Sequence, residues 1–152
     1  MAWKTRFFGV AEAAAFDVRG NLTASGICPP LLQVESFPAQ IAPFVLLIAE
    51  DPDTQIADAP RTFNFRVQVL SPDGDALLVI QQDVPAQPRK IQSLPVRAQL
   101  VAQAPLSIPK AGCYTFSVSF GSPESGTISE TSDLNIWDQA KILSEIEHSS
   151  HG

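Results

Sequence analysis

The stretch LSIPKAGCYTFSVSF, residues 106–120, decides the fold class of this chain. From Tyr114 onward, large apolar residues alternate strictly with small ones. Such a period of two places one set on each face of a β-strand. The large set comprises Tyr114, Phe116, Val118 and Phe120. This pattern predicts a strand with one face turned to an apolar core.

The bend before that strand contains Pro109 and Gly112, and the tyrosine follows directly. A bend followed by a tyrosine is typical of the tyrosine corner of β-sandwich domains, where the hydroxyl bonds to backbone a few residues upstream. Tyr114 is the only tyrosine in the chain, so no other residue could take this role. We therefore expect Pro109, Gly112 and Tyr114 to form a structural corner.

The thirteen prolines divide the rest of the chain into segments with strand-like composition. Proline is excluded from central strands because it cannot donate to the hydrogen-bond ladder. The segments without proline predict seven further strands. They cover residues 4–15, 21–28, 44–50, 61–70, 76–82, 96–103 and 127–136. Together with residues 113–120, these strands predict an antiparallel arrangement.

Two turns carry glycine where the backbone needs a left-handed residue. Ser71-Pro72-Asp73-Gly74 has proline at the second position of a type I turn and Gly74 at the left-handed position of a three-residue hairpin. Gly20 is placed similarly in the turn between the first two strands. The sequence thus predicts a mainly β, single-domain antiparallel β-sandwich of immunoglobulin-like type with seven to eight strands over residues 1–137.

The last segment differs in its periodicity. After Asp138, a candidate N-cap, Ala140, Leu143 and Ile146 recur near helical spacing, and Lys141 lies four residues before a glutamate. We expect a short amphipathic helix over residues 138–148, followed by a disordered tail at 149–152. A helix of this length is marginal alone, so either the sandwich or a second subunit must cover its apolar side.

The connector at residues 28–43 contains several large apolar side chains, which must pack on something. One interpretation is structural: the connector covers an open sheet edge. The other is functional: it binds a partner, because long loops are often functional.

Composition restricts the class of partner. A net charge of −6 argues against nucleic acid, which requires a basic face. No apolar run is long enough to span a bilayer, so we expect no membrane partner.

Residues 4–16 resemble a signal peptide superficially, but Glu12 interrupts the apolar run, which favours a first strand and a cytoplasmic location. Cys28 and Cys113 are expected to be buried reduced thiols, since Cys113 precedes the corner tyrosine and cannot form the immunoglobulin bridge.

Catalytic and ligand-binding motifs are weak. Histidine occurs only as His148 and His151 near the C-terminus, so no internal catalytic triad can form, and we expect no catalytic, metal or cofactor-binding residues. The acidic residues 50–58 could bind calcium, but they lack the regular spacing of a calcium loop. The PxxP match at residues 85–88 is better explained as an extended connector than as a polyproline ligand. Trp3 and Trp137 are expected to plug the core rather than to form a sugar platform.

Several short motifs resemble a family of small bacterial proteins of unknown function. They are the GNLTASGI stretch at residues 20–27, the Phe-Pro-Ala at 37–39, the FVLL at 44–47 and the Gly112, Tyr114, Phe116 pattern. The resemblance would cover about residues 5–137. It implies a β-sandwich and no activity. Our expectation is a non-enzymatic module for protein–protein interaction or self-assembly; the alternative is small-ligand or carbohydrate binding through strand-end loops.

Overall fold

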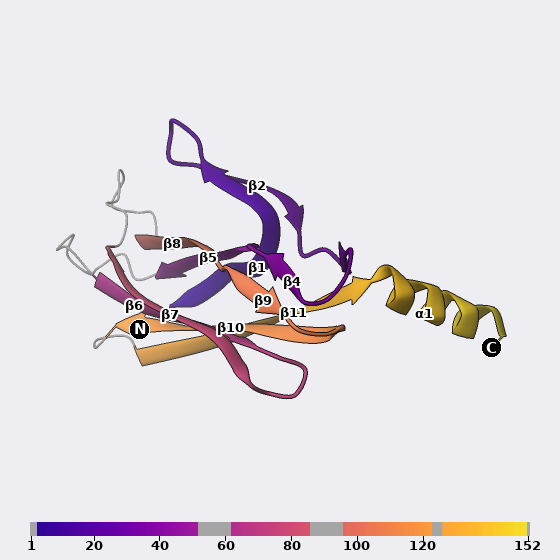
Figure 1. The fold of residues 1–152 in the computed structure, drawn as a ribbon. Helices are drawn as coiled ribbons and strands as arrows, with labels where there is room; N and C mark the ends of the chain where they lie inside the picture. The colour runs from indigo at the N-terminus through magenta and orange to yellow at the C-terminus, as the bar shows by residue number, and fades with distance from the viewer. Residues whose placement is uncertain (1–2, 52–61, 86–95, 123–125, 152) are drawn as a thin grey trace.

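The computed structural model describes residues 3–51, 62–85, 96–122 and 126–151. The protein is mainly β, with several sheets and one C-terminal helix (Figure 1). The four-stranded sheet has the order β2-β1-β5-β8 and the five-stranded sheet the order β3-β11-β10-β6-β7. A third sheet pairs β4 with β9.

The bounds of the elements follow the alternation and proline pattern of the sequence. The four-stranded sheet comprises β1 (Lys4–Phe16), β2 (Leu22–Ile27), β5 (Phe44–Asp51) and β8 (Val96–Gln103). The five-stranded sheet comprises β3 (Leu32–Val34), β6 (Thr62–Leu70), β7 (Ala76–Pro85), β10 (Gly112–Ser122) and β11 (Gly126–Asp138). The remaining elements are β4 (Ala39–Ile41), β9 (Leu106–Ile108) and α1 (Gln139–His151).

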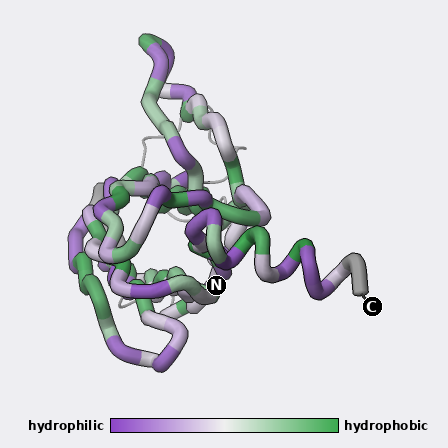
Figure 2. Tube along the Cα trace, turned by 45° about the vertical axis from the view of Figure 1, so that its right-hand side comes forward, coloured by the Kyte–Doolittle hydropathy of each residue, from purple (hydrophilic) through white to green (hydrophobic). Residues whose placement is uncertain are grey.

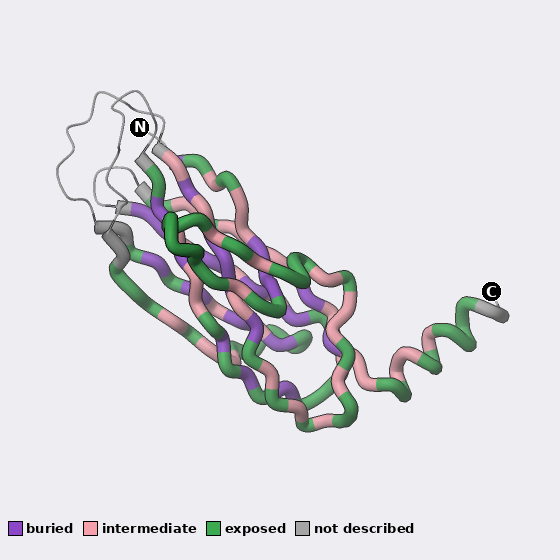
Figure 3. Tube along the Cα trace, turned by 90° about the horizontal axis from the view of Figure 1, so that it is seen from above, coloured by how far each residue is buried: buried purple, intermediate pink, exposed green. Residues whose placement is uncertain are grey.

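Both larger sheets contribute side chains to one apolar core. The predicted alternation in β10 is confirmed, because Tyr114, Phe116, Val118 and Phe120 are all buried. Phe65 on the neighbouring strand β6 stacks on Phe120 with ring centroids 5.9 Å apart. From the other sheet, the core includes Val10 of β1, Val45 and Leu47 of β5, and Ala98 and Leu100 of β8. Figure 3 shows these buried segments running along the length of the body.

The described residues form eleven strands rather than seven or eight. The three extra strands, β3, β4 and β9, have three residues each and lie in segments that we expected to be connectors. The apolar connector at residues 28–43 supplies two of them. β3 pairs in parallel with the end of β11, and β4 pairs with β9. Leu32, Val34, Phe37 and Ile41 pack against the core from this segment, which fits its structural interpretation.

Among the described strands, β3 pairs in parallel with β11, so the expectation of a purely antiparallel arrangement is wrong at β3. The reason is that β3 lies at the start of a long connector rather than next to a tight hairpin. The other predicted strands are present within a few residues of their expected bounds.

Candidate functional site

The bend before β10 is held by the tyrosine predicted from the sequence. Tyr114 is fully buried, and its hydroxyl donates a 2.6 Å hydrogen bond to the carbonyl of Lys110. Burial raises the pKa of Tyr114 above its usual value, and the hydrogen bond to Lys110 opposes this shift only partly. The phenol therefore stays neutral at physiological pH and acts as a hydrogen-bond donor.

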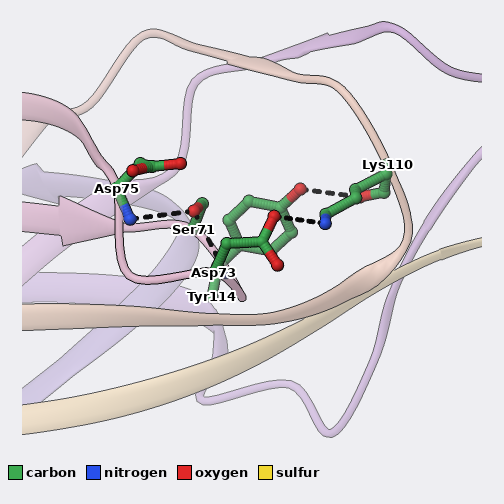
Figure 4. A network of polar contacts seen from close by, with 5 residues as sticks. All are labelled: Ser71, Asp73, Asp75, Lys110 and Tyr114. Carbon is green, nitrogen blue, oxygen red and sulfur yellow. Dashed lines mark hydrogen bonds and ion pairs between the residues drawn. The ribbon is translucent and has the colours of Figure 1, made fainter.

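This corner joins a second turn through a small polar network (Figure 4). In the turn between β6 and β7, the Ser71 hydroxyl accepts hydrogen bonds from the backbone N–H groups of Asp73 (3.2 Å) and Asp75 (3.1 Å). The Asp73 carboxylate forms an ion pair with Lys110, whose carbonyl accepts from Tyr114. The pKa of Lys110 is raised, mainly by its hydrogen bond to Asp73.

Two glycines in these turns are there for different reasons. Gly74 has a φ of 88°, and its N–H bonds to the Ser71 carbonyl at 2.9 Å, as predicted for the hairpin. Gly112 has a φ of 158° and also leaves room for a neighbour: a Cβ placed on it would lie 2.4 Å from Cγ of Pro72. Pro109 is exposed in the bend between β9 and β10. The Tyr114 corner and the Ser71–Gly74 turn are therefore in direct contact.

Gly20 lies far from this network, at the tip of the β1–β2 hairpin. Its φ of 79° is left-handed, and its N–H bonds to the Asp17 carbonyl at 3.0 Å. The Asp17 carboxylate closes the same turn by accepting from the N–H groups of Arg19 and Asn21. The five structural residues named from the sequence thus fall in two places: Tyr114, Gly112, Pro109 and Gly74 gather at one corner, and Gly20 is at the hairpin tip.

Both cysteines are exposed, so the expectation of buried thiols is wrong. For Cys113 the reason is its position: because Tyr114 points into the core, the residue before it points outward. Partial desolvation nevertheless raises the pKa of Cys113. Cys28 follows β2, and its sulfur lies against Gly9 of β1. The two cysteines are unpaired.

The tryptophans do not form a common platform. Trp3 is buried in the core, as expected of a plug. Trp137 is half-buried at the end of β11, and the Lys141 ammonium lies 5.6 Å from the centre of its ring. Neither ring is presented as a broad exposed surface.

One cluster of charged groups on the described strands is a structural pairing across the four-stranded sheet. Glu50 on β5 lies between Arg97 of β8, at 2.9 Å, and Arg6 of β1, at 3.5 Å. In the described part of the chain, no three His, Cys, Asp or Glu side chains come together as a metal site would require. Most of the acidic stretch at 50–58, and the PxxP match after Pro85, lie outside the described residues. No helix among the described residues has the length and apolar character needed to cross a membrane.

The C-terminal helix is the most distinctive feature of the surface. It begins directly at the end of β11, where Asp138 Oδ1 accepts from the N–H of Lys141 at 3.0 Å, confirming the predicted N-cap. Lys141 also pairs with Glu145 at 2.7 Å, which lowers the pKa of that glutamate. The helix extends to His151, three residues beyond its predicted end. The tail predicted to be disordered is therefore helical at residues 149–151.

α1 does not pack on the sheets. Figures 1 and 3 show it leaving β11 and pointing away from the body. As a result Leu143 is 51% exposed and Ile146 58% exposed. The sequence left two possible covers for this apolar side, the sandwich or a second subunit. The described body of the chain does not cover it. The sequence periodicity predicted the apolar side of the helix. It could not show in which direction α1 leaves the end of β11.

A comparison with known protein families finds a match. Residues 6–129 match the model of the family of unknown function DUF6941. The chain belongs to this family. The match contains the Tyr114 corner and the β1–β2 hairpin, and it stops before Trp137 and α1, eight residues short of the extent expected from the sequence motifs. No curated protein matches the chain.

Proposed function

We propose that this DUF6941 member is a non-enzymatic, immunoglobulin-like β-sandwich module that binds another protein through α1. The sandwich assignment is supported by two larger sheets that share one core and by the Tyr114 hydrogen bond at the bend before β10. We place the module in the cytoplasm, where two exposed, unpaired cysteines would stay reduced.

The observation that carries this proposal is the exposure of Leu143 and Ile146 on a helix that points away from the sheets. An isolated helix of thirteen residues is marginal in water, because most helical stability in proteins comes from packing of an apolar face. A capped helix with an uncovered apolar side is well suited to a groove on a partner protein.

Site-specific photo-crosslinking in the source cells tests the proposal. A photoreactive amino acid at position 143 or 146 should give a discrete adduct with a protein that mass spectrometry can identify. Positions 144 and 148 provide the matched control, since both are exposed and lie on the opposite side of the helix. The proposal fails if positions 143 and 146 give no adduct, or the same adducts as positions 144 and 148.

A further inference from the structure

The hairpin of β1 and β2 extends beyond the body as a two-stranded ribbon. Pairing of β1 with β5 ends at Ala11 opposite Phe44. From there to Phe16, β1 pairs only with β2. Figures 1 and 2 show this part rising above the sheets. A two-stranded ribbon is at best marginally stable in water, and here Phe16 and Ile27 are each 48% exposed.

The outer edge of this ribbon is open. β2 is the last strand of its sheet, so its outward N–H and C=O groups meet no strand among those described. Natural proteins protect such edges with charged side chains, prolines or very short strands. The other edges follow this rule: β8 carries Arg97, β7 carries Asp83 and Pro85, and β3 has three residues. β2 has six residues, LTASGI, with no charge and no proline.

We infer that the occupant of this edge is a second copy of the chain, paired antiparallel to β2 across a two-fold axis. The pairing would join the two four-stranded sheets into one sheet of eight strands. The chain carries a net charge of −6, so contact between two copies is favoured at a strip that carries no charge. A two-fold contact brings the same strip of each copy together, and both sides are then free of charge.

The geometry of antiparallel strands restricts the position of the axis. Residues directly opposite each other must share the same hydrogen-bonding type, and this type alternates along a strand. For two identical strands, the two residues of each opposed pair must therefore be an even number of positions apart in sequence. Centred pairing of β2 then puts either Ala24 opposite Ala24 or Ser25 opposite Ser25. In the first arrangement Thr23 lies opposite Ser25 of the second copy.

The size of the contact sets its strength. A strand of six residues is about 20 Å long, and its edge buries much less than the roughly 800 Å² per partner of a standard stable interface. The dimer should therefore be weak and should form only as the concentration rises.

Sedimentation equilibrium of the full chain under reducing conditions tests the inference. The parent should shift from monomer mass towards dimer mass between micromolar and millimolar concentration. Thr23→Lys/Ser25→Lys should remain monomeric, because either register places lysines directly opposite one another, where like charges are destabilising. Both side chains are exposed, so the substitutions leave the core intact.

Two controls separate this edge from other surfaces. Val79→Lys/Gln81→Lys adds the same charges to the exposed side of β7 and should dimerise like the parent. Leu143→Gln/Ile146→Gln changes α1 alone and should also dimerise, so this result is independent of the function proposed for the helix. A parent that stays monomeric throughout would overturn the inference. So would a dimer that survives the β2 lysines.

A crosslinking measurement covers the case in which the lysine variant fails to fold. In a Cys28→Ser/Cys113→Ser background, Ala24→Cys or Ser25→Cys should form an intermolecular disulfide on mild oxidation, depending on the register. Ser107→Cys, at an exposed position on β9, is the control. If neither β2 cysteine crosslinks faster than Ser107→Cys, the inferred pairing is wrong.

Discussion

At the scale of single residues, Tyr114 connects the core to a surface bend. Its ring is fully buried, while its hydroxyl reaches the Lys110 carbonyl at 2.6 Å. Tyr114→Phe keeps the ring and removes only the donor, so the Lys110 carbonyl loses this partner. We expect a loss of about 1 kcal/mol in the free energy of unfolding, measured by urea denaturation. A variant that unfolds at the parent's midpoint would show that the bend does not depend on this bond.

Gly112 is required because Pro72 lies against it, and its φ of 158° is also one that residues with a side chain rarely adopt. Gly112→Ala would push a methyl group into the proline ring, where the nearest atom is 2.4 Å away. Overpacking of this kind costs about 1–3 kcal/mol, and the same urea experiment measures it. Removing the ring in Gly112→Ala/Pro72→Ala should recover part of the loss. Strictly additive effects of the two substitutions would contradict this explanation.

At the scale of elements, α1 depends on its cap and its side-chain pair. Asp138 accepts from the N–H of Lys141, so Asp138→Ala should destabilise the helix by about 0.5–2 kcal/mol, whereas Asp138→Asn should be close to neutral. The helical circular dichroism signal and the amide shifts of residues 139–151 measure the effect. Equal helicity in the alanine and asparagine variants would show that the cap contributes nothing.

The pH dependence of α1 follows from Glu145. Its hydrogen bond to Lys141 lowers its pKa in the folded helix. A lowered carboxyl pKa means that the stabilisation is present above the unfolded value, about 4.3, and is lost as the pH falls through the lower folded value. Helicity should therefore decrease in that acidic window. Glu145→Gln should show a smaller decrease, and an identical profile in both proteins would contradict the assignment.

The sequence predicted most of the β elements because their side chains alternate over long stretches. In β10 the alternation of Tyr114, Phe116 and Val118 was sufficient to identify the buried face. The same alternation places Cys113 on the face opposite Tyr114, and the expectation of a buried thiol was wrong because that face is exposed. The strands β3, β4 and β9 were missed because three residues are too few for a period of two to be recognised.

At the scale of the whole molecule, the arrangement of elements could not be derived from local patterns. The exposure of α1 depends on where β11 ends, and the ribbon protrudes because β5 stops pairing at Phe44. Both are properties of strand length and register in the assembled sheets. The protein thus consists of a closed core with two extensions, one helical and one extended, whose apolar side chains the described body leaves uncovered.

Hydrogen–deuterium exchange of the dilute, monomeric full chain tests this account most directly. The central strand β10 should exchange slowest, near the rate set by global unfolding, while the amides of α1 and the outward amides of β2 should exchange much faster. Protection of α1 or β2 equal to that of β10 in the monomer would contradict the account, because these elements would then be packed on the body rather than available to a partner.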